Sequence, residues 1–297
     1  MKTTGILFFT VSIVLCSLND LIAKYLHQAS LSQIIFFKSL FGLITLMIFT
    51  KKDTFFKASK NIDKWVVLRC VSLIIANGLW YFGLMKASLS SLALSNHSIP
   101  FFIVFFSFFT RINKPSPILF VSLTIIFFGS AFPLFCQNSF TSNHMILITS
   151  CAFYALSDLL CQASVKGQNP IEITIQTSLC MTLFSSPALL LNWSPIGLFD
   201  LFLLSLIGIV SLLILFCLIK AYEIHSAARL APLHYLEFIV AVLFEFVFFK
   251  ETPDQTELIG IFVVLCGLFA QSLMKKIKII TLRKVKDGKR IPESNHL

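Results

Sequence analysis

Apolar runs long enough to cross a lipid bilayer follow one another along almost the whole chain. A membrane-spanning helix needs about 20 such residues, because the hydrocarbon core is about 30 Å thick and each helical residue advances about 1.5 Å. Ten runs qualify, at about 5–25, 31–50, 66–86, 88–109, 116–135, 144–165, 171–191, 198–221, 226–250 and 256–275. Backbone groups find no water in hydrocarbon, so we expect each run to be a helix. The predicted fold class is an all-α polytopic membrane protein with ten transmembrane helices.

The composition agrees with a protein that has little mass outside the membrane. Hydrophobic residues make up 57% of the chain and charged residues 13%, whereas soluble domains have about 25% charged residues. A net charge of +10 would suggest nucleic-acid binding in a soluble protein, but here the basic residues lie mostly in short loops and in a tail at 275–290. Beside a membrane span, such residues set topology and contact anionic lipid headgroups. We therefore expect membrane lipid, and no nucleic acid, as a partner.

Lysine and arginine are distributed unequally between the two sides of the expected membrane domain. They concentrate in the loops on the side of the N-terminus, for example at Lys51, Lys52 and Lys57, whereas the opposite side has Lys86 and Lys250. The positive-inside rule then places both termini in the cytoplasm.

Short matches between the two halves of the chain recur at an offset of 137 to 139 residues. "SLNDLI" at 17–22 matches "ALSDLL" at 155–160, and "HSIPF" at 97–101 matches "HYLEF" at 234–238. Compositional bias among Leu, Ser and Phe is the alternative explanation, although the matches keep the same order in both halves.

The matches predict that the chain is built from two repeats. We expect a first five-helix repeat at 1–137, a second at 138–276, and a basic cytoplasmic tail at 277–297. Since five is odd, the second repeat must enter the membrane in the opposite orientation, and inverted repeats commonly frame a substrate site near the midplane.

Carboxylates stand inside these runs, although a charge at the bilayer centre costs about 2.5–3.5 kcal/mol. Asp20 and Lys38 are expected at one depth, either as an ion pair that fixes a helical hairpin or as substrate ligands. Asp158 is the repeat counterpart of Asp20, but Thr177 replaces the lysine, so we expect Asp158 to lack a buried partner and to be protonated or to meet a cation in transit. Glu237 falls near the midplane and is the main candidate for binding a cation.

Two histidines and an arginine are further candidates around Glu237. His234 lies one turn earlier and is placed to share a proton or hydrogen bond with it. A structural pair of Glu237 with His234 or Arg229 is the alternative to a substrate role. His97 occupies the repeat position of His234, where a satisfied hydrogen-bonding residue is the alternative to a ligand.

Polar aromatic residues at intramembrane depth complete the candidate substrate site. Trp80, Tyr154 and Tyr235 lie at intramembrane depth, and interfacial anchoring explains the two tyrosines less well, because each is well inside its run. Their rings offer π-faces to cations and to flat ligands.

Catalytic motifs are absent from the sequence. No HExxH, GxSxG or phosphate-cradling glycine loop occurs. The eight cysteines form no CxxC pair and nearly all lie in apolar runs, as small buried residues do. We therefore expect no enzyme, no cofactor and no metal, with a membrane-embedded enzyme acting on a lipid-soluble substrate as an alternative.

Longer motifs carry a family resemblance. They are "NDLIAKYL" at 19–26, "SIPFF" at 98–102, and "IKAYEIHSAARLAPLHYLE" at 219–237 followed by "FKETPD" at 249–254. On these motifs the chain resembles the drug/metabolite transporter superfamily of ten-helix, EamA-type carriers over about 5–276, and within it the S-adenosylmethionine uptake transporter group. Lys38 and His234 depart from that pattern, which tends to have arginine and another basic residue at these positions.

The resemblance implies a bacterial inner-membrane carrier that imports S-adenosylmethionine by alternating access, with exchange for S-adenosylhomocysteine as one expected mode. Glu237 or Asp158 would face the sulfonium and ammonium groups, and Lys38 or Arg229 the carboxylate. The three polar aromatic residues would take the adenine or sulfonium. A carrier or exporter of another amino acid or small metabolite is the alternative within the same fold.

Overall fold

The computed structural model describes residues 2–267 except 27, 87–94, 97, 111–114, 137–141, 166, 192, 251–254, 256–257, 260–261 and 264. Over these residues all regular structure is helical, which confirms the predicted all-α class. Seven described helical segments are long and apolar enough to cross a membrane, the seventh being the interrupted segment Ala227–Phe249, and two further apolar stretches, Ser98–Thr110 and Pro117–Phe128, are shorter. The expected tenth span at 256–275 falls largely outside the described residues, so the count of ten stays a prediction.

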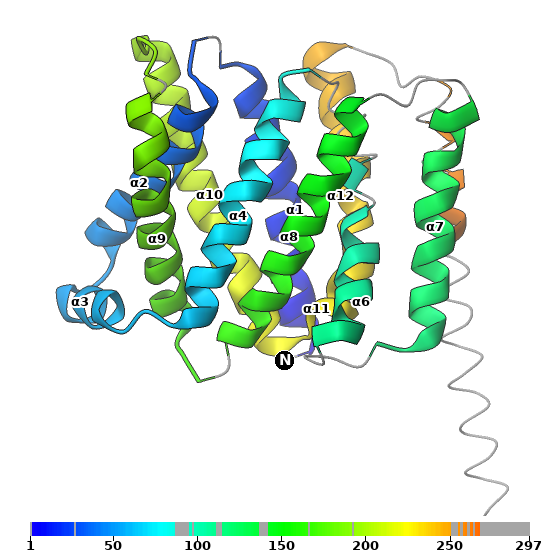
Figure 1. Cartoon of the computed structure of the whole chain (residues 1–297), viewed down its shortest axis with the longest axis horizontal. Helices are drawn as coiled ribbons and strands as arrows, with labels where there is room; N and C mark the ends of the chain where they lie inside the picture. The colour runs from blue at the N-terminus through cyan, green and yellow to red at the C-terminus, as the bar shows by residue number, and fades with distance from the viewer. Residues whose placement is uncertain are drawn as a thin grey trace, which may run out of the picture.

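The helices follow the apolar runs closely. Their bounds are α1 (Lys2–Lys24), α2 (Leu31–Phe49), α3 (Lys52–Lys60), α4 (Lys64–Leu84), α6 (Ser98–Thr110), α7 (Pro117–Cys136), α8 (Ser142–Ser164), α9 (Pro170–Leu191), α10 (Leu198–Ile224), α11 (Ala227–Leu230), the 3-10 turn η1 (Ala231–His234), α12 (Tyr235–Phe244) and the π-helical turn η2 (Glu245–Phe249). Figure 1 shows the long helices standing side by side, with α3 at the lower left edge of the bundle, beside α9. Helix α3 was expected as a loop, and it is the main addition to the predicted elements.

The ninth expected run is not one continuous helix. It begins with the four-residue helix α11, passes through η1, and only then continues as α12. Pro232 stands at the start of η1, where its missing N–H and fixed φ favour a break in the α-helical hydrogen bonding. The break places the His234 and Glu237 side chains on the cavity described below.

Packing between the two halves is reciprocal. Helix α4, the third long helix of the first half, runs along α8, the first of the second half, and α10 packs in the same way along α1. Helix α2 packs against α9, its own counterpart, and α1 and α8 run in opposite directions (Figure 1). Each half therefore completes its packing with helices of the other half.

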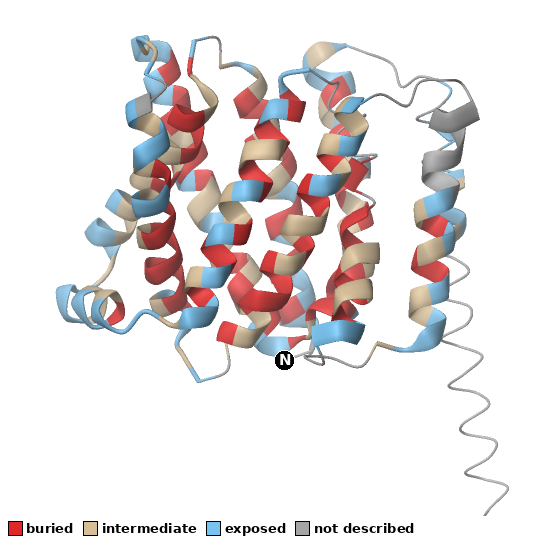
Figure 2. Ribbon diagram, viewed as in Figure 1, coloured by how far each residue is buried: buried red, intermediate tan, exposed pale blue. Residues whose placement is uncertain are grey.

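Burial is distributed as expected for a protein that contacts lipid. Large apolar side chains face outward, including Phe49 and Leu198, which are 84% and 87% exposed. Figure 2 shows exposed residues along the outer faces of the helices and buried residues toward the middle of the bundle. The buried set includes charged and polar side chains such as Arg69, Asn77 and Glu237. Because buried polar groups are costly without partners, these residues lead directly to the candidate site.

Candidate functional site

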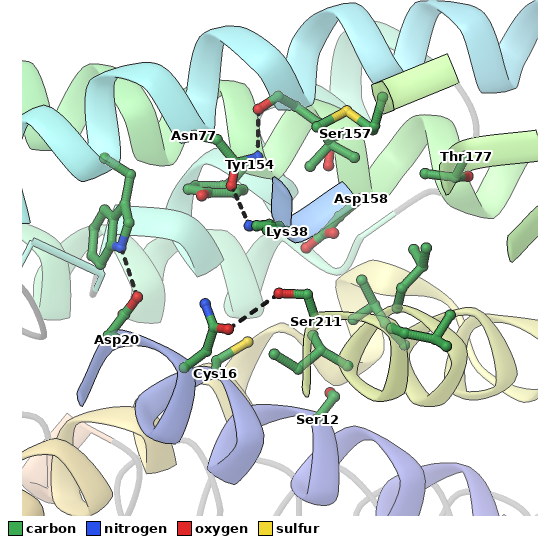
Figure 3. A pocket seen from close by; sticks show the side chains of 18 of the residues that line it. Ser12, Cys16, Asp20, Lys38, Asn77, Tyr154, Ser157, Asp158, Thr177 and Ser211 are labelled. Carbon is green, nitrogen blue, oxygen red and sulfur yellow. Dashed lines mark hydrogen bonds between the residues drawn. The ribbon is translucent and has the colours of Figure 1, made fainter. Parts of the chain in front are cut away.

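A cavity of about 210 Å³ opens between helices of both halves. Its walls come from α1, α2, α4, α8, α9 and α10, together with Asn96, Ile99, His234 and Glu237. Charged and polar aromatic side chains on the cavity are Asp20, Asp158, Glu237, Lys38, Arg69, Trp80, Tyr81 and Tyr154. Figure 3 shows Asp20 and Thr177 toward opposite sides of this space, with Lys38 and Asp158 between them.

A hydrogen-bonded network fixes Lys38 within the cavity wall. Its Nζ donates to Asn77 Oδ1 at 2.6 Å and to the Tyr81 hydroxyl at 3.3 Å. Nζ also lies 5.1 Å from the centroid of the Tyr81 ring, within reach of a cation–π interaction. Asn19 Nδ2 donates to the same hydroxyl at 3.2 Å, while its Oδ1 accepts from Ser211 Oγ at 3.1 Å. The Lys38 ammonium therefore already has hydrogen-bond and cation–π partners within the protein.

Asp20 is held by an aromatic residue rather than by a lysine. Its Oδ1 accepts a hydrogen bond from Trp80 Nε1 at 3.1 Å, and the Trp80 ring meets the Tyr154 ring edge to face at 6.2 Å. The ion pair between Asp20 and Lys38 that was one reading of the sequence is wrong, because Lys38 turns toward Asn77 and Tyr81. Both side chains nevertheless line the same cavity.

Asp158 has a partner that sequence reasoning did not anticipate. Its Oδ2 lies 3.7 Å from His234 Nε2, and the two side chains are 9% and 10% exposed. The edge of the His234 ring also packs against Phe9, with ring centroids 5.0 Å apart. The expectation of an unpartnered Asp158 is therefore wrong, since the break before α12 turns His234 toward it.

Glu237 is buried at the wall of the cavity and bonded to an amide. Its Oε1 accepts from Asn96 Nδ2 at 2.9 Å, and the side chain of Asn96 also accepts from Cys151 Sγ at 3.6 Å. Ser17 Oγ donates to the Glu237 backbone carbonyl at 3.4 Å. No basic side chain within the described part of the chain forms an ion pair with this carboxylate.

Two other candidates from the sequence, Arg229 and Tyr235, lie outside the cavity lining. Arg229 is exposed and is not part of the cavity lining, so its expected pairing with Glu237 is wrong; it lies on the short helix α11, which turns it outward. Tyr235 is fully buried but lies outside the lining. His97 falls outside the described residues.

Arg69 is the main cavity residue that sequence reasoning missed. It stands near the start of α4, where an arginine is ordinarily explained as an interfacial residue. In the structure it is 1% exposed and faces the cavity, and its Nη1 donates to Thr177 Oγ1 at 3.4 Å. A lone arginine within "VVLRCVSL" (66–73) was the available signal.

The charges around the cavity define what it can bind. Three acidic side chains, Asp20, Asp158 and Glu237, line it against two basic ones, Lys38 and Arg69, together with His234. No group of three or more His, Cys, Asp or Glu side chains in the described ranges is placed to hold a metal ion. The arrangement suits a small dipolar molecule that carries excess positive charge and a flat ring.

Comparison with known sequences gives consistent matches. The profile of the EamA-like transporter family matches residues 3–135 and again residues 141–273. The S-adenosylmethionine uptake transporter of Rickettsia conorii is 28% identical over 268 residues, covering 88% of this chain and 90% of the relative. The transporter of the same name from Rickettsia bellii is 26% identical over 266 residues, with the same coverage.

A more distant relative and a solved structure share the architecture. The pseudopaline exporter CntI of Pseudomonas aeruginosa is 21% identical over 282 residues, covering 93% of this chain and 98% of the relative. One solved crystal structure superposes with a TM-score of 0.68 at 15% identity, covering 92% of this chain and 99% of that chain. At this identity the likeness concerns the fold alone.

Proposed function

The chain belongs to the EamA-like transporter family and is a multi-pass membrane transporter, and we propose that its substrate is S-adenosylmethionine, taken up into the cell. The observation that carries this proposal is the cavity, which gathers three carboxylates, two cations and polar aromatic rings between the two halves of the chain. The similarity of about nine-tenths of the chain to the Rickettsia S-adenosylmethionine uptake transporters supports the same substrate.

The chemistry of S-adenosylmethionine matches the cavity charge. The molecule carries a sulfonium, an ammonium and a carboxylate, and therefore a net charge of +1, beside a cavity lined by one more acidic than basic side chain. Asp158 and Glu237 are proposed to face its cationic centres. Trp80 and Tyr154, whose rings pack edge to face, are proposed to contact the adenine. A buried carboxylate that a cation periodically approaches has a functional reason to remain in the membrane.

Alternating access is the proposed mechanism. The reciprocal packing of α1 with α10 and of α8 with α4 supports two inverted repeats that rock against one another around the cavity. Exchange for S-adenosylhomocysteine, which lacks the sulfonium charge but keeps the rest of the molecule, would use the same site. The predicted placement is a bacterial inner membrane with both termini in the cytoplasm.

An exporter of another amino acid or small metabolite is the second candidate. The similarity to the pseudopaline exporter CntI, over 93% of this chain, favours it specifically. Both candidates use one fold and one cavity, so they differ in cargo and direction rather than in architecture.

Uptake of radiolabelled S-adenosylmethionine into intact cells expressing the chain tests the proposal. Cells with an empty vector are the control, and unlabelled S-adenosylmethionine, S-adenosylhomocysteine and methionine are the competitors. Uptake displaced by the two adenosyl compounds and not by methionine is the expected result. Absence of uptake in cells shown to contain the protein in their membranes would refute the proposed import and favour the exporter.

A further inference from the structure

Arg69 is a buried cation whose hydrogen-bonding capacity is almost unused. A guanidinium has five N–H donors and cannot shed its proton in a protein. Among the described residues Arg69 makes one hydrogen bond, of 3.4 Å to Thr177 Oγ1, and its buried Nε has no partner there. None of the ion pairs between described residues includes it. Burying a guanidinium whose N–H donors are unused is costly unless an anion pairs with it.

Lys38, the other basic side chain on the cavity, differs from Arg69 because most of its hydrogen-bond donors are already used. Its ammonium already donates to Asn77 and Tyr81 and lies over the Tyr81 ring. A ligand anion at Lys38 would have to compete with these groups, whereas at Arg69 it would meet unused donors. Thr177 adds to the preference, because its hydroxyl accepts from Arg69 and keeps its own hydrogen for a further acceptor.

Resting on the proposed function, we infer that Arg69, with Thr177, binds the carboxylate of the substrate and makes the carrier select molecules that have one. Arginine pairs with a carboxylate through two parallel N–H···O bonds, a geometry that a lysine cannot reproduce. A polyanion such as a phosphate ester fits poorly, because three carboxylates line the same cavity. A single carboxylate on an otherwise cationic molecule can pair with Arg69, while the positive charges of the molecule suit the acidic side chains of the cavity.

The position of Arg69 also orients the substrate. Arg69 and Trp80 stand on the same helix α4, and at 1.5 Å per residue they are about 16 Å apart along its axis. Both line the cavity, Arg69 beside Thr177 and Trp80 beside Asp20. The inferred orientation therefore places the amino-acid end of the substrate at Arg69 and its flat ring at Trp80. Figure 3 shows Asp158 between Thr177, the partner of Arg69, and Asp20, the partner of Trp80.

Decarboxylated S-adenosylmethionine tests this assignment, because it keeps the sulfonium, the ammonium and the adenosyl group but lacks the carboxylate. Competition against labelled S-adenosylmethionine should show the wild-type protein preferring the carboxylated compound by about 10- to 100-fold. In Arg69→Gln this preference should disappear or reverse, since the cavity then becomes more negative. Arg69→Lys keeps the positive charge but not the two parallel N–H donors, so its preference for the carboxylated compound should lie between those of the wild type and Arg69→Gln. Lys64→Gln is the matched control, because it removes a cation from an exposed position of the same helix, and it should keep the wild-type preference.

The outcomes separate this inference from the proposed substrate. A wild-type protein that takes up both compounds equally well, or an Arg69→Gln variant that keeps the full preference, overturns the role of Arg69 while import stands. If the wild-type protein takes up neither compound, the thermal stabilisation of the purified protein by added ligands is measured instead of uptake. Amino acids are then compared with their own decarboxylated amines, such as methionine with 3-(methylthio)propylamine and arginine with agmatine. Stabilisation by the acids alone, lost in Arg69→Gln and reduced in Arg69→Lys, supports the inference, and equal responses to acid and amine overturn it.

Discussion

Replacing Glu237 by glutamine removes a charge from the cavity wall with little change of shape. Glu237 is 8% exposed, and its Oε1 accepts from Asn96 Nδ2 at 2.9 Å. The glutamine side chain has nearly the same size and offers the same carbonyl acceptor to that amide. We therefore expect Glu237→Gln to insert and fold normally, so that any loss of transport reflects the missing charge.

The size of the effect follows from the interaction of the carboxylate with a substrate cation. At a separation of about 5 Å and an effective dielectric constant of about 20, two unit charges attract by about 3 kcal/mol. Losing this interaction should weaken apparent affinity for S-adenosylmethionine by roughly 100-fold. The concentration dependence of initial uptake rates measures this directly, normalised to the amount of protein in the membrane.

Two comparisons make the Glu237 result specific. Glu223→Gln also removes a glutamate charge, but Glu223 is exposed, is paired with Lys220 at 3.1 Å, and lies outside the cavity lining, so uptake should be unchanged. Competition by S-adenosylhomocysteine, which has the ammonium but not the sulfonium, identifies the cation that Glu237 faces. Loss of affinity for S-adenosylmethionine alone indicates the sulfonium, and an equal loss for both indicates the ammonium. Wild-type affinity in Glu237→Gln would refute the reasoning, because it would mean that no cation approaches this carboxylate.

Two further substitutions test the site and the packing. Asp158→Asn should reduce uptake at least as much as Asp20→Asn, because the amide oxygen at position 20 can still accept from the Trp80 indole N–H, whereas the carboxylate of Asp158 is the group proposed to face the substrate cations. The reverse order in uptake assays would contradict the assignment of Asp158 to those cations. Gly208→Ala should lower the free energy of unfolding by about 1–3 kcal/mol, since an added Cβ would stand 2.6 Å from Phe41 Cβ where α2 and α10 meet. Gly78→Ala is its control, with nothing within 4 Å of the added Cβ, and melting curves in detergent should separate the two.

Much of the architecture could be predicted from the sequence, because a membrane helix must form its backbone hydrogen bonds within its own segment. The ends of α2, α8 and α9 lie within about two residues of the predicted runs. The predicted similarity of the two halves agrees with the family profile, which matches the chain twice. The break in the ninth run was foreseen only in part, from Pro232, because proline marks where a helix is interrupted but not where the following residues turn.

The candidate site was predicted less completely. Asp20, Lys38, Trp80, Tyr154 and Asp158, together with His234 and Glu237, were identified as unusual for their depth, and the structure brings all of them to one cavity. Whether they bind substrate stays a prediction. Their partners were not foreseen, since hydrogen bonds such as that from Asn96 to Glu237 join residues far apart in the chain.

The sequence by itself determined that this chain crosses the membrane repeatedly as helices and places a few charged residues within them, because apolar length and charge are local properties. Only the tertiary structure decided which way each of those residues points. Arg69 faces the cavity and Arg229 faces outward, although both are arginines near the ends of apolar runs. The physical reason is that lipid-facing and core-facing surfaces are both apolar, so hydrophobic periodicity does not show which face of a helix meets its neighbours.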